Sequence, residues 1–293
     1  MNTRDLQYFI ELVKLKNYSQ VAREFSVSQP TITQSVQRLE REFQTTLVNP
    51  DRTHREDMIT RSGLLLYENA QLLLNQLAVT RQTIERDKLK QIQIGIPPLI
   101  GRQLMPVLVR DLDNQILKRL KIIAKGSHDL LREVKQGKLD ISLIASLEPI
   151  QVAGLDVQQI TATSFKLIVS EDHPLANREA VSFTELADEK FITYDQQYIH
   201  QKAFQTYCKY TGIAPDVAVY RMPDVSWVKE LVRQNEGVAL MIEPAVRNEP
   251  GIKVLTLTDQ VPIQFEISLV TQHNYVLSAD EQQVVDVMER LVF

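Results

Sequence analysis

The stretch SVSQPTITQSVQRLEREF, from Ser26 to Phe43, decides how the first part of the chain folds. Its apolar residues recur at steps of four, three and four, which is the spacing of one face of an α-helix. We expect this face to pack into a core and the opposite face, rich in glutamine and threonine, to stay accessible. The apolar face consists of Ile32, Val36, Leu39 and Phe43.

Two more short helices are predicted ahead of this one. The first follows the candidate caps Asn2 and Thr3, and the second follows the candidate cap Asn17. Ser28 is a natural N-cap for the third helix, and Pro30 lies in its first turn, where a missing N–H costs no hydrogen bond. Two short helices separated by a tight turn, with a polar face on the second, predict a helix-turn-helix.

The segment VNPDRTHREDMITRSG, residues 48–63, combines turn residues and a charged tip, and it predicts a two-stranded wing. Thr60 can then cap a helix of about 28 residues that runs to about Lys90, a rod of roughly 40 Å. An apolar seam without a partner in its own domain favours dimerisation, and the alternative is a helix packed on its own winged domain. The seam consists of Leu66, Ala70, Leu73, Leu77 and Ile84.

From Gln91 onward, short strands alternate with helices. The segments IQIGI, LDISLIA, FKLIVS and VALMI are predicted strands, and LLREVKQG and VKELVRQNEG are predicted helices. This alternation indicates an α/β domain with a mostly parallel sheet. The chain is therefore predicted to have an all-α, winged N-terminal part followed by an α/β part.

The composition is that of an ordinary globular protein, with 44% hydrophobic and 24% charged residues among 293. No apolar run approaches the roughly 18 residues of a membrane span, and charged residues interrupt the N-terminus where a signal segment would lie. We expect a cytoplasmic protein without membrane contact. The single cysteine, Cys208, lacks a companion for a disulfide or a metal, so we interpret it as a half-buried apolar residue rather than a reactive thiol.

The formal net charge of −4 argues at first against a nucleic-acid ligand. The charge is unevenly distributed, however, because residues 1–90 carry 13 Lys and Arg against 11 Asp and Glu, while residues 91–293 carry 20 against 26. Any surface that binds a polyanion is therefore expected in the first third of the chain.

The motifs are similar, in order and along the whole chain, to those of the LysR-type transcriptional regulators. Within this family, DRTHRE and the general texture resemble the malolactic-type regulators. In the N-terminal part the resemblance is carried by Ser19, Ala22, VSQPTIT at 27–33, Leu39-Glu40, Leu47 and the spacing from Thr60 to Gly63. In the remainder it is carried by IQIGIPPLIGRQLMPVLVRDL, EVKQGKLDISLI, DHPLA and LVRQNEGVALMIEPAV.

The resemblance implies a DNA-binding regulator that forms dimers, assembles into tetramers and bends promoter DNA in response to a small-molecule effector. RNA polymerase is a further candidate partner, and no cofactor is expected. The implied domains are a winged helix-turn-helix domain (1–60), a linker or dimerisation helix (61–90) and a two-lobed effector-binding domain similar to periplasmic binding proteins (91–293). Within the last domain, lobe 1 would comprise 92–161 and 266–293, and lobe 2 would comprise 162–265.

Three positions depart from the family pattern. The family usually has an apolar-Phe-Glu-Arg run where this chain has LVNP at residues 47–50, so the start of the wing is expected to be reshaped. The family often has arginine near Gln34 and Gln37, and these amides argue against strong phosphate or guanine contacts there. Where two glycines are common, this chain has Asn235 and Gly237, and asparagine also tolerates a positive φ.

A recognition helix presents its first turns to the major groove. Because Gln binds adenine through two hydrogen bonds and a Thr methyl can contact the thymine methyl, we expect a site rich in A·T pairs. The residues expected at base edges are Ser28, Gln29, Pro30, Thr31, Thr33 and Gln34. The residues expected at phosphates are Arg38, Arg52, His54 and Arg55, and the alternative for Arg52 and Arg55 is a solvated wing tip neutralised by its own acids.

Helix N-termini that face the cleft of such a domain offer free N–H groups and a positive dipole end, which suit a small carboxylate. Ser127, Gln197 and Ser226 could add hydrogen bonds, and His128 could pair with a carboxylate if protonated. The alternative is that these residues only cap their own helices. The full candidate set is Pro98, Leu99, Ile100, Ser127, His128, Gln196, Gln197 and Ser226.

Two other classes of protein, enzymes and solute-binding proteins, share the two-lobed α/β domain. The glycines are never closer than Gly95 and Gly101, so the chain has no dinucleotide fingerprint and no phosphate-binding loop. The five histidines are scattered without metal-ligand spacing, and we expect neither catalytic residues nor a metal site. The N-terminal third and the missing signal segment argue against a solute-binding protein.

Overall fold

The computed structural model describes residues 2–49, 58–195, 198–222 and 224–291. The chain divides into two compact units, residues 1–84 and 85–293, and the division falls within the long helix α4 (Arg61–Lys88). No described helix combines the length and the hydrophobicity that a membrane span requires.

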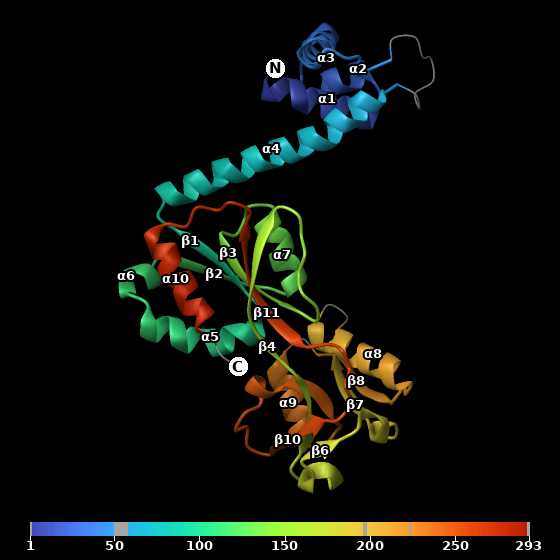
Figure 1. Ribbon diagram of the computed structural model, residues 1–293, viewed down its shortest axis with the longest axis vertical. Helices are drawn as coiled ribbons and strands as arrows, with labels where there is room; N and C mark the ends of the chain where they lie inside the picture. Colours follow the sequence, from blue (N-terminus) through green and yellow to red (C-terminus); the bar gives the residue numbers. More distant parts are fainter. Residues whose placement is uncertain (1, 50–57, 196–197, 223, 292–293) are drawn as a thin grey trace. The chain divides into compact units, whose positions relative to one another are not determined.

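The first unit packs α1 (Thr3–Leu15), α2 (Tyr18–Glu24) and α3 (Gln29–Phe43) around one apolar core (Figure 1). The side chain of Asn2 accepts the N–H of Asp5, and the Asp5 carboxylate accepts the N–H of Asn2 in return. Asn17 caps α2 by accepting the N–H of Gln20. The caps predicted at Asn2 and Asn17 are therefore confirmed.

The start of α3 differs in one detail from the prediction. Ser28 occupies the N-cap position and Pro30 lies in the first turn, as expected. The Ser28 hydroxyl makes no capping hydrogen bond, however, and lies 2.8 Å from the Thr31 hydroxyl instead. This short connection from α2 to α3 forms the predicted helix-turn-helix.

The apolar face of α3 is buried except at its end. Ile32, Val36 and Leu39 lie in the core, as predicted. The prediction for Phe43 is wrong, because its side chain is 46% exposed. Phe43 is the last residue of α3, and Gln44 follows it in the left-handed conformation that ends the helix. The apolar face of α3 therefore extends beyond the part of the helix that packs into the core.

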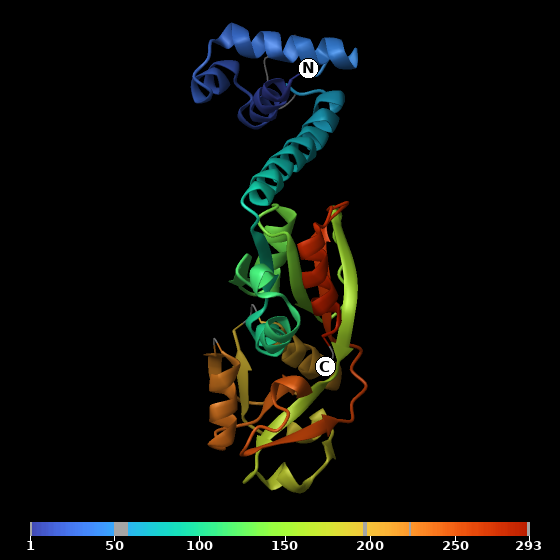
Figure 2. The same ribbon diagram turned by 90° about the vertical axis from the view of Figure 1, so that its left-hand side faces the viewer.

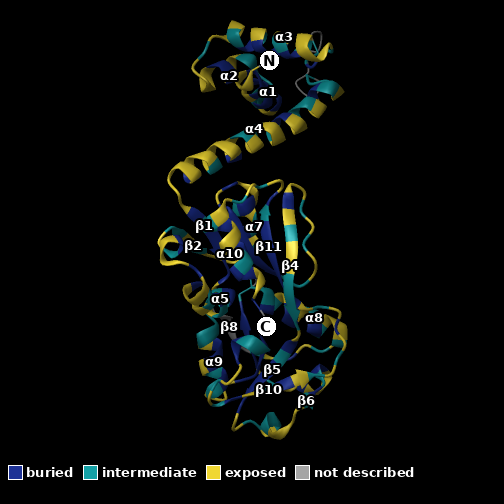
Figure 3. Ribbon diagram, turned by 60° about the vertical axis from the view of Figure 1, so that its left-hand side comes forward, coloured by how far each residue is buried: buried dark blue, intermediate teal, exposed yellow. Residues whose placement is uncertain are grey.

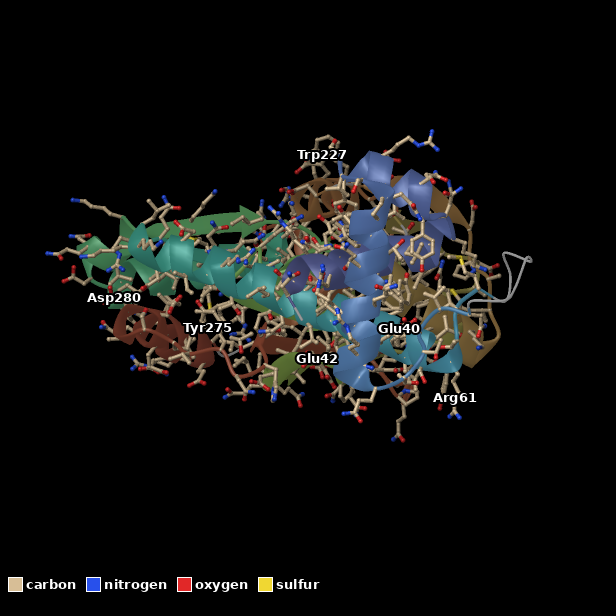
Figure 4. The ribbon with its side chains drawn as sticks, turned by 90° about the horizontal axis from the view of Figure 1, so that it is seen from above. Glu40, Glu42, Arg61, Trp227, Tyr275 and Asp280 are labelled. Atoms are coloured by element: carbon tan, nitrogen blue, oxygen red, sulfur yellow. The ribbon has the colours of Figure 1, made fainter. Side chains whose placement is uncertain are left out.

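The base of the predicted wing is attached to the end of α3. Val48 and Ile59 form an antiparallel bridge. Glu40, which Figure 4 labels on α3, accepts the N–H groups of Leu47 at 2.8 Å and Val48 at 3.2 Å. One carboxylate therefore fixes the start of the wing to this helix. The tip, residues 50–57, lies outside the described residues.

The helix α4 has the predicted length of 28 residues. The Thr60 hydroxyl accepts the N–H of Gly63 at 3.0 Å, which confirms the predicted cap. A Cβ on Gly63 would lie 2.4 Å from the carbonyl oxygen of Leu47, so only glycine fits there without a shift. Much of α4 is exposed (Figure 3). Its exposed large apolar residues are Leu64, Leu65, Leu72, Leu73 and Ile84. Of the predicted seam, Leu73 and Ile84 belong to this set, whereas Ala70 is buried in the core of the first unit and Leu66 packs against that core.

In the second unit, a five-stranded sheet has the order β2-β1-β3-β11-β4. Its strands are β1 (Ile92–Ile96), β2 (Leu120–Ala124), β3 (Ile141–Ser146), β4 (Leu155–Thr163) and β11 (Phe265–Gln272). One face is covered by α5 (Pro98–Asp111), α6 (Asn114–Leu117) and α10 (Ala279–Glu289), and the other by α7 (Ser127–Lys135) (Figures 1 and 2).

A four-stranded sheet has the order β6-β10-β5-β9, and β7 pairs with β8 beside it. The strands are β5 (Phe165–Ser170), β6 (Ala180–Val181), β7 (Phe191–Tyr194), β8 (Val217–Met222), β9 (Ala239–Ile242) and β10 (Ile252–Leu257). The helices are α8 (Ile199–Thr211) and α9 (Val225–Arg233), with short 3-10 turns at η2 (Pro174–Asn177), η3 (Phe183–Leu186) and η4 (Glu243–Ala245).

The chain passes between the two sheets twice, where β4 leads through Ser164 into β5 and where the segment after β10 enters β11 (Figure 2). The predicted strands and helices of this unit are confirmed, but the expectation of a mostly parallel sheet is wrong. Of the pairings, β1–β2, β1–β3, β6–β10 and β7–β8 are parallel, and the others are antiparallel. The sheets are mixed because β11 runs antiparallel to both β3 and β4, and β5 runs antiparallel to both β9 and β10.

Candidate functional site

The polar face of α3 forms one accessible surface. Ser28, Gln29, Pro30 and Gln34 are exposed, and Thr31 and Thr33 are half-buried beside them. The Gln29 amide donates to the Thr33 hydroxyl at 3.3 Å, and this hydroxyl donates to the Gln29 carbonyl at 3.3 Å. The residues that the sequence placed at base edges therefore share a surface of amides and hydroxyls, the groups that read base edges in the major groove.

Arg38 lies on the same helix, but its guanidinium is bound to Asp5 of α1. Its guanidinium donates to both carboxylate oxygens of Asp5, through Nε at 3.2 Å and through Nη2, and the Ser35 hydroxyl donates to the same carboxylate at 2.7 Å. Asp5 is 1% exposed and Arg38 is 38% exposed at the side chain. Burial alone raises the pKa of Asp5, but the hydrogen bonds from Arg38 and Ser35 outweigh it and hold that pKa below its ordinary value.

The other three predicted phosphate contacts, Arg52, His54 and Arg55, lie outside the described residues. Asp5 itself is a residue that the sequence did not reveal. Its partners come 30 and 33 positions later in the chain, so no local pattern indicates them.

The second unit contains a cleft at which four helices begin. It has about 660 Å³ of free volume, which includes solvent space at its open mouth. The first residues of α5 and α7 and the ends of the segments before α8 and α9 line it. The polar and charged residues among its lining are Arg102, Ser127, Tyr194, Tyr198, His200 and Asp224.

The helices α5 and α7 start at the cleft without a side-chain cap. Their N-terminal N–H groups therefore remain available, which favours a ligand over the alternative that local residues only cap these helices. The Ser127 hydroxyl accepts the N–H of Ala145 at 2.9 Å, and its own proton is still free to be donated. Pro98 and Leu99 also line the cleft, as expected.

The start of α9 behaves differently. The Asp224 carboxylate accepts the N–H of Ser226 at 2.7 Å and also its hydroxyl. Arg102 donates to the Ser226 hydroxyl at 2.7 Å and lies 3.8 Å from Asp224. The hydrogen bonds from Ser226, with the charge of Arg102, keep the pKa of Asp224 below its ordinary value. Asp224 therefore caps α9, while Ser226 is held between Asp224 and Arg102 and does not line the cleft.

Two further candidates do not present their side chains to the cleft. Ile100 is fully buried in the apolar core beneath the cleft. His128 points away to solvent, with a side chain that is 82% exposed and 3.8 Å from Asp129. Each follows a residue that does line the cleft, and one residue along a helix turns the side chain by about 100°. Gln196 and Gln197 lie outside the described residues.

Arg102 and His200 line the cleft and were missed by the sequence analysis. Arg102 lies four positions after Pro98, on the same side of α5, and this spacing is the signal that could have revealed it. His200 packs against the rings of Tyr194 and Phe265, and burial lowers its pKa to about 4. Its Nε2 atom has no hydrogen-bond partner among the described residues, and nothing in the local sequence indicates this burial.

Two known families of protein domain match the chain. The bacterial regulatory helix-turn-helix protein, lysR family, matches residues 3–64, and the LysR substrate binding domain matches residues 86–292. Together they cover the surface on α3 and the cleft.

Similar proteins span nearly the whole chain. The malolactic fermentation system transcriptional activator of Lactococcus lactis subsp. lactis (strain IL1403) is 31% identical over 292 residues, 99% of each chain. The hydrogen peroxide-inducible genes activator of Dickeya chrysanthemi is 28% identical over 253 residues, 85% of this chain and 81% of its own. The solved structure of the Corynebacterium glutamicum OxyR C206 mutant has a TM-score of 0.58 at 21% identity and covers 99% of this chain and 92% of that chain, a likeness of fold.

Proposed function

This chain belongs to the LysR family of bacterial helix-turn-helix transcription regulators, and from that premise we propose that it controls promoters in response to a small carboxylic acid bound in the cleft. As a LysR regulator it binds DNA, carries an effector-binding domain and is not an enzyme. Its similarity to a malolactic regulator agrees with the resemblance expected from the sequence.

We propose that residues 1–60 bind DNA, residues 61–90 form the dimer contact and residues 91–293 bind the effector. The exposed leucines of α4 support the second assignment, because an apolar seam of this kind is covered when a second copy packs against it. Two such dimers would form a tetramer on a long promoter site in the cytoplasm, with RNA polymerase as a further partner.

For DNA, we propose that Ser28, Gln29, Pro30, Thr31, Thr33 and Gln34 lie at base edges and favour A·T pairs. The wing residues Arg52, His54 and Arg55 would bind phosphates. Arg38 would contribute less, because Asp5 already holds Nε and Nη2 of its guanidinium. Most of the phosphate contact would then come from the wing.

For the effector, the observation that carries the proposal is the meeting of two uncapped helix starts, α5 and α7, with Arg102 at one cleft. Free N–H groups, a positive dipole end and a guanidinium together favour a carboxylate. The Ser127 hydroxyl can donate one more hydrogen bond. Because the pKa of His200 is about 4, this residue is neutral at physiological pH and leaves the positive charge to Arg102.

Hydrogen peroxide is a second candidate signal, because a relative is named a hydrogen peroxide-inducible genes activator. This chain has one cysteine, and an intramolecular disulfide needs two. Burial raises the pKa of the half-buried Cys208 thiol, so little of it is the reactive thiolate. These properties favour a carboxylate over peroxide as the signal.

The test is calorimetric titration of the full chain with small mono- and dicarboxylates and with their neutral amides. At least one acid should bind while its amide does not, and Arg102→Met should weaken this binding about tenfold or more, the contribution of a charge-assisted hydrogen bond. Ser127→Ala should weaken it less. Arg110→Met is the matched control, because Arg110 lies on the same helix and pairs with the exposed Asp111 outside the cleft.

Unchanged affinity in Arg102→Met would contradict the proposed cleft chemistry. The DNA-binding part is tested separately by a gel shift with promoter fragments at low salt. Absence of any shifted fragment would contradict the regulator function itself.

A further inference from the structure

A second cavity lies where the chain passes between the two sheets of the second unit. It has about 910 Å³ of free volume counted to its open mouth, and its lining includes Leu147, Glu148, Ser164, Phe165, Gln264 and Glu266. The segments that line it therefore include both passages of the chain between the sheets. A ligand in this cavity would touch both connections between the two sheets.

The second cavity is separate from the effector cleft, but only a wall of rings divides them. Phe265 is the first residue of β11 and lines the cleft. The residues on either side of it, Gln264 and Glu266, line the second cavity. Phe165 lines the second cavity and lies 5.8 Å from His200 and 6.1 Å from Phe265, measured between ring centroids. His200 and Phe265 both line the cleft on the other side.

The charged side chains that line the second cavity are all acidic. Glu148, Asp259 and Glu266 line it, and its described lining contains no Lys, Arg or His. Asp259 is committed to the protein, since it accepts the Ser182 hydroxyl at 3.0 Å and the Phe183 N–H. Lys166, which is not part of the lining, donates to the hydroxyl of the lining residue Thr256 at 3.1 Å.

Glu266 supplies the independent indication of a ligand. Its side chain is only 8% exposed, and its Oε2 atom is buried without a hydrogen-bond partner among the described residues. Ser146 lies directly opposite on β3, and its hydroxyl is also buried without a partner. A buried carboxylate oxygen that accepts nothing carries a large desolvation cost, which a donated hydrogen bond from a cation would offset.

We propose that this second cavity binds a small organic cation whose ammonium group donates to Glu266. The described carboxylates do not converge closely enough to hold a single metal ion. An organic amine, in contrast, can place its ammonium group at Glu266 and extend its chain toward Glu148 at the exposed rim. The proposal is independent of the carboxylate in the cleft, although a ligand behind the ring wall could alter affinity in the cleft, and the reverse would hold equally.

The test is calorimetric titration of the full chain with 1,5-diaminopentane at low salt, with 1,5-pentanediol and MgCl₂ as comparison ligands. The diamine should bind saturably, and the diol and Mg²⁺ should not. Glu266→Gln should weaken the diamine about tenfold or more, as expected for loss of a buried charge-assisted hydrogen bond. Glu148→Gln should weaken it less, and Glu171→Gln, an exposed acid outside the cavity, should leave it unchanged.

Absence of diamine binding, equal binding of the diol, or unchanged affinity in Glu266→Gln would each overturn the proposal. Binding of Mg²⁺ in place of the diamine would overturn the assignment to an organic cation. If Glu266→Gln fails to fold, the comparison of diamine with diol on the unaltered protein and the Glu148→Gln variant still decide the result. None of these measurements uses DNA or a carboxylate, so they do not depend on the proposed regulator function.

Discussion

At the scale of single residues, one buried carboxylate connects the start of the chain to the helix proposed to read DNA. Asp5 caps α1 and also accepts hydrogen bonds from Ser35 and Arg38 on α3. This second role holds the DNA-reading helix at a fixed rotation against α1. A change at Asp5 therefore affects both the stability of the first unit and the presentation of its polar surface.

We predict that Asp5→Asn destabilises the first unit by about 1–2 kcal/mol at pH 7, allowing for the exposed side of Arg38. Because the pKa of Asp5 is lower in the folded chain than its ordinary value of 3.8, its contribution is present above that value and is lost as the pH falls through the folded pKa. Urea unfolding at pH 7 and pH 3 measures this. The difference between variant and unaltered protein should shrink at pH 3.

The matched control is Glu24→Gln, an exposed acid at the end of α2. It should change the unfolding free energy little at either pH. An equal loss of stability in Asp5→Asn at both pH values would show that the Asp5 charge is not the stabilising feature.

At the scale of elements, α3 and the wing have different chemistry. The described face of α3 presents uncharged amides and hydroxyls, while the wing sequence contains Arg52, His54 and Arg55. Glu40 joins the two elements by accepting N–H groups from the first wing residues. Base reading and phosphate binding are therefore expected to be separable by mutation.

We predict that Gln34→Ala weakens binding to the cognate site by about 1–3 kcal/mol and relaxes its preference at one base pair, with an unchanged salt dependence. In contrast, Arg55→Ala should weaken binding to all sequences and lower the slope of log K against log salt by about 1. Fluorescence anisotropy at several salt concentrations measures both. The same salt slope change in both variants would contradict the division between helix and wing.

At the scale of the whole molecule, α4 carries several exposed leucines. Leu65, Leu72 and Leu73 are each more than half exposed. Isolated exposed leucines are common, but a row of them along one helix usually marks an interaction surface. A LysR regulator acts as an oligomer, and this row is the surface on which we propose that two copies meet.

We predict that Leu65→Glu together with Leu72→Glu converts the dimer to a monomer, because burying two carboxylates against a second α4 is strongly unfavourable. Light scattering after size-exclusion chromatography measures the mass. Arg81→Gln, an exposed site on the opposite face of the same helix, should leave the mass unchanged. A double variant that keeps the mass of the unaltered protein, with intact helix content, would place the dimer contact elsewhere.

The sequence determined much of this protein because many of its signals are local. Caps at Asn2, Asn17 and Thr60, the buried face of α3 and the length of α4 follow from residue type and spacing within a few turns. The family followed from ordered motifs along the chain, and the accessible amide face of α3 followed from helical periodicity. Several strands were not predicted, among them the edge strand β2, whose side chains alternate little in hydrophobicity and are mostly exposed.

Only the tertiary structure decided which side chains meet. Asp5 and Arg38, Phe265 and His200, and Ser146 and Glu266 are each brought together by packing or strand pairing between distant parts of the chain. The same packing turned Ile100 and His128 away from the cleft and left Phe43 exposed. Sequence periodicity specifies the face of a helix, whereas burial and partners depend on what the rest of the chain places against that face.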